Sequence, residues 1–276
     1  MCKLFSRFSA ADLPCIRITS AVITEVKAKL ANEQIKMGKF HCGAPELEKS
    51  EHSFLNILKS PEHPKEMMAV VHQGNKDASL LVFGRMGLTN FAYSPLELVD
   101  GIPVSCSEQL FKLHCMTMHM GISNNCDEVA INILCALEPF KAKTATGKLA
   151  NFNKVLWDAK SKAAMYASIL RICMEEATFA RFKRYAALLT GSRLLIVEAN
   201  DDKIWGINMY TSAFLQALLE KMTPESDLFE EAKALFDGTN ELGDALTTFF
   251  EEIRDMSFED YLKAVSVVKF VEIIDV

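Results

Sequence analysis

The stretch Leu194-Leu195-Ile196-Val197, followed by Asp202-Lys203-Ile204-Trp205-Gly206, decides how the second half of this chain is interpreted. The apolar run is typical of a buried strand, and the acidic turn after it carries one of only 2 tryptophans. Trp is costly to leave in water, and Asp is costly to bury without a partner. The sequence therefore predicts a small polar pocket at the end of a core strand.

Length and composition are those of a soluble globular protein. The chain of 276 residues is long enough to bury a sizeable core, and 50% of it is hydrophobic and 24% charged. A formal net charge of −6 gives no reason to expect a surface that wraps nucleic acid, although it leaves room for a local basic groove. No apolar run is long enough to span a membrane, so we expect no membrane partner.

The cysteines and histidines suggest neither a disulfide framework nor a metal site. The 8 cysteines form no CxxC pair, and no secretory segment is evident, so we expect reduced thiols in a cytoplasmic protein. The two histidines near Cys115, His114 and His119, are five residues apart and lack the i, i+4 spacing that places two histidine ligands on one helix face. We therefore expect no metal and no cofactor.

Breaks in the pattern divide the chain into three parts. The turn-forming residues Gly74-Asn75-Lys76-Asp77 separate a first region from the rest of the sequence. We expect an N-terminal extension over residues 1–78, a main domain over 79–257 and a C-terminal segment over 258–276. Neither the role of the extension nor the oligomeric state follows from the sequence.

The spacing of apolar residues predicts the elements within these parts. In the extension it predicts a helix over 21–39 and a second short helix over 46–58. Strands are expected over 80–83, 96–99 and 194–198, and helices from Ser105 and over 154–176, 179–189, 210–222, 224–238 and 240–254. These elements predict an α+β fold that is dominated by helices and has a few short strands.

Several polar residues at element ends have two interpretations each. Ser105 and Glu108 have the spacing of a capping box, in which the glutamate folds back onto the start of its own helix. Alternatively, Glu108 faces a site, where the helix dipole favours its negative charge by about 0.3–1 kcal/mol. Asp202 is either a turn residue or a site residue. Asn240, after a helix stop at Gly238, is either a helix cap or a site residue.

Six segments of the chain form an ordered set that points to a known family. They are Gly87-Leu88-Thr89-Asn90-Phe91; Ser105-Cys106-Ser107-Glu108-Gln109; Ala142-Lys143 with Gly147-Lys148, Asn151-Phe152 and Trp157; Leu188-Leu189-Thr190-Gly191; Val197-Glu198 with Asp202 to Gly206; and Gly238-Thr239-Asn240-Glu241-Leu242-Gly243. Taken in order over residues 80–255, they resemble the NADAR family, the YbiA-like N-glycosidases. The resemblance implies a helix-dominated YbiA-like domain.

The resemblance also implies an activity. It points to an enzyme that hydrolyses the bond between the anomeric carbon of a ribose and a base nitrogen. Known family activities include the removal of ADP-ribose from guanine in nucleic acids and the hydrolysis of early riboflavin-pathway intermediates. The implied partner is a small nucleotide or an ADP-ribosylated base, either free or within nucleic acid.

Breaking such a bond builds positive charge on the sugar ring and negative charge on the departing base. A fixed carboxylate suits the first charge, so Glu108 is the first catalytic candidate. Asp202 is the second, either activating water or binding ribose hydroxyls. The substrate-binding candidates are Asn90, Phe91, Lys143, Gly147, Trp157, Trp205, Gly206 and Asn240.

One departure from the family pattern leaves the activity open. Many family members carry a lysine seven residues after the glutamate, and this chain has Cys115 there. A lysine amine forms a Schiff base with a ring-opened sugar, which a cysteine cannot do. Lys112, one helical turn after Glu108, is the candidate substitute. The alternatives to an enzyme are a module that binds ADP-ribose or a nucleotide without turnover, and an interaction protein with a vestigial pocket.

Overall fold

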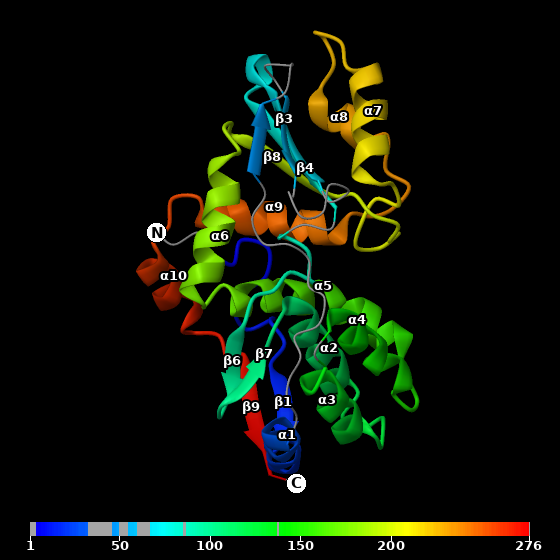
Figure 1. Ribbon diagram of the computed structural model, residues 1–276, viewed down its shortest axis with the longest axis vertical. Helices are drawn as coiled ribbons and strands as arrows, with labels where there is room; N and C mark the ends of the chain where they lie inside the picture. The colour runs from blue at the N-terminus through cyan, green and yellow to red at the C-terminus, as the bar shows by residue number, and fades with distance from the viewer. Residues whose placement is uncertain are drawn as a thin grey trace. The chain divides into compact units, whose positions relative to one another are not determined.

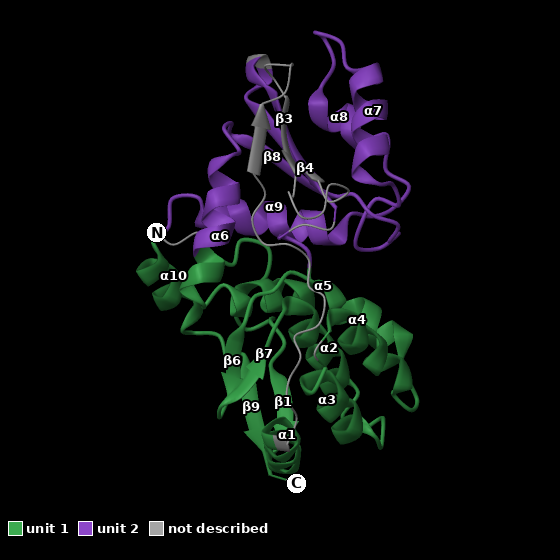
Figure 2. Ribbon diagram, viewed as in Figure 1, with its two compact units in different colours: residues 1–40, 90–179, 257–276 green, residues 41–89, 180–256 purple. Residues whose placement is uncertain are grey.

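The computed structural model describes residues 4–32, 46–49, 55–59, 67–84, 87–136 and 138–275 (Figure 1). The chain forms two compact units, each assembled from separate stretches of sequence (Figure 2). Unit 1 contains residues 1–40, 90–179 and 257–276, and unit 2 contains residues 41–89 and 180–256.

Unit 2 is built on a five-stranded sheet with the order β2-β3-β4-β5-β8. Neighbouring strands are antiparallel except for β5 and β8, which run parallel with Leu81 opposite Ile196. The strands are β2 (Glu46–Lys49), β3 (Leu55–Lys59), β4 (Met67–Gln73), β5 (Ala78–Phe83) and β8 (Arg193–Glu198). A short 3-10 turn, η1 (Gly74–Lys76), joins β4 to β5.

The short helix expected over 46–58 was wrong, because this segment forms β2 and β3. Short apolar runs do not distinguish a helix from a strand by spacing alone. Here β3 pairs with β4 from Leu55 to Lys59, so ladder hydrogen bonds within the sheet decide the conformation. The strands predicted at 80–83, 96–99 and 194–198 are confirmed as β5, β6 (Leu96–Val99) and β8.

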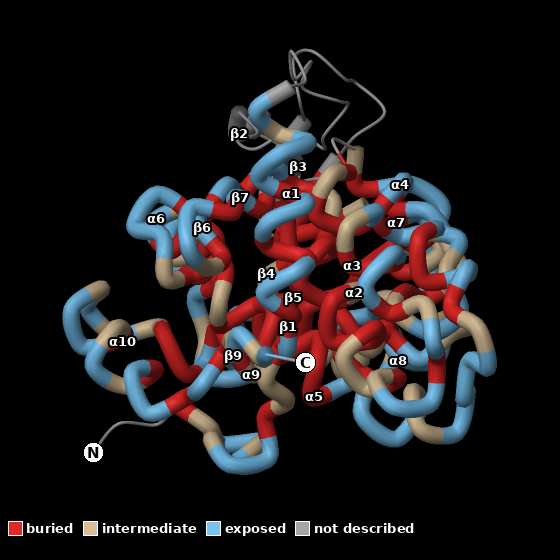
Figure 3. The backbone as a smooth tube through the Cα atoms, turned by 90° about the horizontal axis from the view of Figure 1, so that it is seen from below, coloured by how far each residue is buried: buried red, intermediate tan, exposed pale blue. Residues whose placement is uncertain are grey.

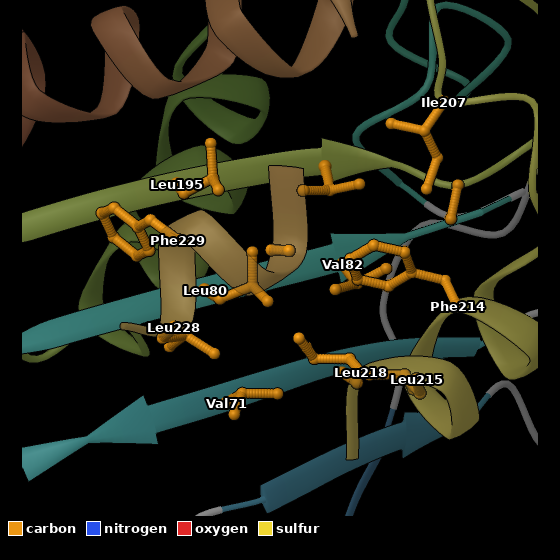
Figure 4. Packing of buried hydrophobic residues seen from close by; sticks show 14 of the residues in the cluster. Val71, Leu80, Val82, Leu195, Ile207, Phe214, Leu215, Leu218, Leu228 and Phe229 are labelled. Carbon is orange, nitrogen blue, oxygen red and sulfur yellow. The ribbon is translucent and has the colours of Figure 1, made fainter. Parts of the chain in front are cut away.

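Helices α7 (Thr211–Lys221) and α8 (Leu228–Lys233) pack on one face of the sheet in unit 2 (Figure 4). Alternate residues of β5 and β8, such as Leu80, Val82 and Val197, meet Phe214 of α7 in this core. The alternation follows from the two-residue period of a strand. Helix α9 (Glu241–Ile253) lies against β8, and its Phe249 and Phe250 pack edge-on against Phe182 of α6 (Glu176–Ala187).

Unit 1 combines two small sheets with a group of helices. Its strands are β1 (Ile16–Thr19), which pairs in parallel with β9 (Val271–Ile274), and β6, which forms a hairpin with β7 (Ile102–Val104). Its helices are α1 (Ser20–Asn32), α2 (Ser107–Met118), α3 (Cys126–Leu134), α4 (Pro139–Ala145), α5 (Lys154–Ile172) and α10 (Phe258–Val265). Helix α2 contacts α3, α4, α5 and β1, and most of its residues are buried (Figure 3). It is the central element of the unit.

The α+β, helix-dominated fold is confirmed, although α3, α4, α10, β1, β4, β7 and β9 were not predicted and several element ends differ. The helix predicted from Pro224 begins only at Leu228, where the Asp227 side chain accepts from the amides of Phe229 and Glu230. The N-terminal helix is described up to Asn32, and its predicted continuation to residue 39 lies outside the described residues. The domain boundaries at residues 78 and 257 stay a prediction. Among the described helices, none is both long and apolar enough to cross a membrane.

Candidate active site

The N-terminus of α2 is capped by Gln109 and not by the predicted pair of Ser105 and Glu108. The Gln109 side-chain oxygen accepts a hydrogen bond from the Ser105 amide at 2.6 Å, which is the backward reach that a capping box assigns to its glutamate. The helix begins at Ser107, and the N-cap residue Cys106 makes no side-chain cap. The capping-box interpretation of Glu108 was therefore wrong, and its carboxylate does not fold back onto the helix start.

Gln109 also ties the start of α2 to the end of α3. Its side-chain nitrogen donates to the carbonyl oxygens of Ile133 at 3.0 Å and of Ala136 at 3.2 Å. The Gln109 side chain is buried, so these bonds satisfy groups that have no access to water. The position of Glu108, the preceding residue, is thereby fixed by the packing of two helices.

The carboxylate of Glu108 is held between Lys112 and Asn90. Glu108 is only 4% exposed, and its Oε1 lies 3.6 Å from the Lys112 ammonium one turn along α2. Its Oε2 lies 3.5 Å from the Asn90 side-chain nitrogen, and its backbone amide donates to the Asn90 carbonyl at 3.0 Å. A charge buried to this degree requires such partners, because desolvation of an unpaired carboxylate is very costly.

Aromatic rings and a second lysine surround this group. The Lys112 ammonium lies 4.9 Å from the centre of the Phe111 ring, and that ring packs at 4.8 Å against Trp157 of α5. Lys143, on α4, places its ammonium 5.9 Å from the ring of Phe91, the residue after Asn90. Contacts of this kind between cations and rings are favourable, and the one at Phe111 adds to the ion pair that holds the largely buried Lys112 side chain. Together they give a site with positive charge, flat apolar surface and one carboxylate.

Cys115 occupies the place at which the resemblance implies a lysine. It lies on α2 and is buried, and burial raises the pKa of its thiol to about 12. Burial raises the pKa of Cys106, at the start of the same helix, to about 12 as well. A protonated thiol is a poor nucleophile and carries no positive charge. Cys115 therefore supplies neither covalent chemistry nor charge beside Glu108.

His119, the residue after α2, has hydrogen-bond partners at both ring nitrogens. Its Nδ1 lies 2.7 Å from the Cys115 carbonyl, and its Nε2 accepts from the amide of Asn153 at 3.0 Å. A carbonyl only accepts, so Nδ1 carries the proton. The fixed ring stacks at 4.8 Å against Phe152, which is 44% exposed. The sequence analysis considered His119 only as a metal ligand and did not predict that it stacks on Phe152. The signal that pointed to this ring pair was Asn151-Phe152 in the family pattern.

In unit 2, the Asp202 carboxylate is used within its own turn. One oxygen accepts hydrogen bonds from the amides of Ile204 and Trp205, both at 2.9 Å. The Asp202 amide donates in turn to the Asn200 side chain at 2.8 Å. This is the turn chemistry that the residue type favours, and it places Trp205, which is partly buried, against the start of α9.

The turn at 202–206 and the segment at 238–243 form one joint at the end of β8. Backbone amides of Asn240 and Leu242 donate to the carbonyls of Gly206 and Trp205, both at 3.1 Å. A Cβ atom at Gly206, Gly238 or Gly243 would collide with neighbouring backbone, which explains three glycines of the family pattern. The two segments that looked like separate motifs in the sequence are therefore one packed assembly.

Asn240 completes this joint with its side chain. It is fully buried and adopts a left-handed conformation (φ 55°), and its side chain makes no helix cap. Instead, its oxygen accepts from the Glu198 amide at 3.0 Å, and its nitrogen donates to the Ile196 carbonyl at 2.8 Å. The side chain therefore bonds to the backbone groups of β8 that a neighbouring strand would otherwise pair with. The helix-cap interpretation of its side chain was wrong.

The structure thus divides the predicted site residues between the units. A chain of contacts in unit 1 connects the first group, which consists of Asn90, Phe91, Glu108, Lys112, Lys143 and Trp157. Gly147, also in unit 1, lies in the exposed 3-10 turn η2 (Thr146–Lys148) that follows α4. The joint in unit 2 contains the second group, which consists of Asp202, Trp205, Gly206 and Asn240.

Comparison with known proteins gives one family. No curated protein matches the chain. The family model described as the NADAR domain matches residues 76–254, which is well over half of the 276 residues and includes every candidate site residue. The chain therefore belongs to the NADAR family.

Proposed function

We propose that this protein is an N-glycosidase that hydrolyses the bond between a ribose and a base nitrogen. The ribose is part of ADP-ribose, as in ADP-ribosylated guanine, or carries a 5-phosphate. The family is associated with hydrolase activity of this kind. The observation that carries the proposal is Glu108, a carboxylate that is 4% exposed, is not used to cap its helix and has a lysine beside it.

The reaction assigns complementary roles to this pair. As the bond from the anomeric carbon to the base nitrogen breaks, the sugar becomes cationic and the base anionic. Glu108 stabilises the sugar cation, and the Lys112 ammonium, 3.6 Å away, stabilises the departing base. Water then adds its hydroxyl to the anomeric carbon, and its proton goes to the base nitrogen. Both charges develop in a buried site, where electrostatic stabilisation is stronger than in water.

The other candidates provide binding. Lys143 is exposed and takes a phosphate oxygen, while Phe91 and Trp157 offer flat apolar surface to a base or sugar. In the proposal, Gly147 lets a substrate phosphate approach the backbone, since the space beside this exposed glycine is open. Asp202, as a water activator or ribose ligand, and Trp205, as a substrate contact, keep the roles that the family resemblance implies. Gly206 and Asn240 are buried in the joint and act on the site only by holding it in shape.

The test measures the release of free base by chromatography. The purified protein is incubated with ADP-ribosylated guanosine, free or within an oligonucleotide, and separately with a ribosylamino-pyrimidine phosphate. Glu108→Gln is expected to reduce the rate by about 100-fold or more, because it removes the charge and keeps the shape. Glu128→Gln is the matched control, since Glu128 also lies in the first turn of a helix but is exposed. Equal turnover in both variants would remove Glu108 from the mechanism.

A second candidate function is binding without turnover. The observation that favours it is Cys115, whose buried thiol replaces the lysine that the family resemblance implies. On this alternative the protein binds ADP-ribose or a related nucleotide, and calorimetry shows a complex although no base appears over hours. Cys115→Lys separates the two functions. If the wild-type protein only binds because it lacks this lysine, the variant is expected to release base.

A further inference from the structure

Asn90 and Ser107 make contacts that orient Glu108 before any substrate is bound. Ser107 is the first residue of α2, and its hydroxyl lies 3.3 Å from the Asn90 side-chain oxygen and 3.4 Å from the Asn90 carbonyl oxygen. Both of these oxygens only accept, so the hydroxyl donates toward Asn90. The Glu108 amide fixes the backbone of the same residue, because it donates to the Asn90 carbonyl at 3.0 Å.

The Glu108 carboxylate decides which way the Asn90 amide faces, because it only accepts. The Ser107 hydroxyl, which can donate or accept, then donates to the Asn90 side-chain oxygen and holds that orientation. With the side-chain oxygen toward Ser107, the side-chain nitrogen is directed at Glu108 Oε2, 3.5 Å away. The flipped amide would place its oxygen against the carboxylate oxygen, which is repulsive. Only one orientation of Asn90 therefore agrees with both neighbours, and it presents a donor to Glu108.

The carboxylate is thereby contacted at both oxygens by donors from different segments. Lys112 reaches Oε1 from the next turn of α2, and Asn90 reaches Oε2 from the loop before β6. Asn90 is 9% exposed and Ser107 is 8% exposed, so water competes little for these contacts. Contacts of 3.3 to 3.6 Å are long for a finished hydrogen bond, as is common in catalytic groups before substrate binds.

We propose that Ser107 and Asn90 are positioning residues that act in series to hold the Glu108 carboxylate in the orientation its chemistry needs. The proposal rests on the N-glycosidase function proposed above. It assigns to the Asn90 side chain the orientation of Glu108 and not the binding of substrate hydroxyls. A carboxylate that is already oriented lowers the activation barrier of bond cleavage and does not change how tightly substrate binds. Loss of either residue therefore reduces kcat and leaves KM nearly unchanged.

The kinetic test uses two variants of Ser107 and one control variant. Ser107→Ala is expected to reduce kcat about tenfold with KM within about twofold, and Ser107→Thr, which keeps the hydroxyl, is expected to recover most of the loss. Ser105→Ala is the matched control, because Ser105 lies two residues away and bonds to Gln109 through its backbone amide. A rise in KM with kcat unchanged would assign Ser107 to substrate binding and overturn the proposal.

The serial order is tested by a double variant. If Ser107 acts only through Asn90, then Ser107→Ala added to Asn90→Leu lowers kcat no further than Asn90→Leu alone. Effects that multiply would show two independent roles and would contradict the relay.

A nuclear magnetic resonance measurement separates this proposal from the proposed function. The Asn90 side-chain amide signal is identified by its disappearance in Asn90→Leu. Ser107→Ala is expected to shift this signal and to speed its exchange with solvent about fivefold or more, whereas Ser105→Ala leaves it unchanged. If the wild-type protein releases no base, the glycosidase function fails while this readout still decides the relay. An Asn90 signal that ignores Ser107→Ala overturns the relay whatever the enzyme does.

Discussion

The side-chain nitrogen of Asn240 donates to the carbonyl oxygen of Ile196 at 2.8 Å, and this bond closes the open edge of β8. On its other side β8 pairs with β5, so its outward amides and carbonyls need partners elsewhere. Asn240 supplies two contacts, and the hydroxyl of Thr247 accepts from the Ile196 amide at 2.9 Å. Side chains near and on α9 thus take the place of a sixth strand.

Replacing Asn240 is expected to destabilise the protein strongly. Asn240→Ala leaves the Glu198 amide and the Ile196 carbonyl buried without these bonds and strains a left-handed position, at a cost of about 3–4 kcal/mol. The control is Asn208→Ala, because Asn208 has the same positive φ of 55° but makes an exposed bond to Asp237. Urea unfolding measures both variants, and a loss in Asn240→Ala no greater than in the control would show that the bonds to β8 matter little.

Gln109 gives a second prediction about stability. Gln109→Met keeps the length of the side chain but leaves the Ser105 amide and the carbonyls of Ile133 and Ala136 without their partner. We expect a loss of about 2–4 kcal/mol in the free energy of unfolding, because buried polar groups are costly to leave unpaired. Gln216→Met, on the exposed face of α7, should change stability by less than about 0.5 kcal/mol. Thermal and urea denaturation of the two variants provide the comparison.

Lys183 is expected to be structural although it is a charged residue. Its ammonium donates to the carbonyl oxygens of Ile253 at 3.0 Å, Arg254 at 2.6 Å and Met256 at 3.1 Å, at the end of α9. A cation at a helix C-terminus satisfies carbonyls that the helix leaves without partners. Lys183→Met should lower the free energy of unfolding by about 2 kcal/mol. Lys221→Met, in the last turn of α7, is the exposed control and should have almost no effect.

Acid is expected to destabilise the protein through His114. This side chain on α2 is buried, and burial lowers its pKa to about 3. Because the pKa is lower in the folded state than the ordinary value near 6.5, the unfolded state binds the proton first and stability falls as the pH drops below that value. Between pH 7 and pH 5 this histidine alone accounts for a loss of about 2 kcal/mol.

The measurement is the free energy of unfolding as a function of pH. His114→Met should flatten the curve between pH 7 and pH 5. His72→Gln should retain most of the slope, because His72 is only partly buried, although burial lowers its pKa too. A curve for His114→Met that falls as steeply as that of the wild type would assign the acid sensitivity to other groups.

The sequence predicts those parts of the fold whose signals are local. The strand at 194–198 and the long helix that became α5 follow from apolar runs and spacing alone. The segment at 46–58 does not, because its conformation depends on pairing with β4. Local spacing is the same for a short buried strand and part of a helix, so only the partner strand decides.

Local sequence signals were also insufficient to predict the contacts of the candidate site. The sequence identifies Glu108 at a helix start, but it assigns the cap to the wrong side chain. The choice of Gln109 depends on carbonyls at the end of α3, which lie more than 20 residues away. Asn240 was correctly identified as the residue before a helix, yet its side chain bonds to β8, which is remote in sequence. In each case a long-range hydrogen bond competes with a local one and wins.

The parallel pairing of β1 with β9 has a consequence for synthesis of the chain. Ile16 leaves the ribosome early, whereas its partner Val271 emerges some 250 residues later. At about 5–20 residues per second this delay is on the order of tens of seconds, during which β1 has no strand beside it. The segments of unit 2 all precede β9 in the sequence, so β1 acquires its partner strand only after they have been translated.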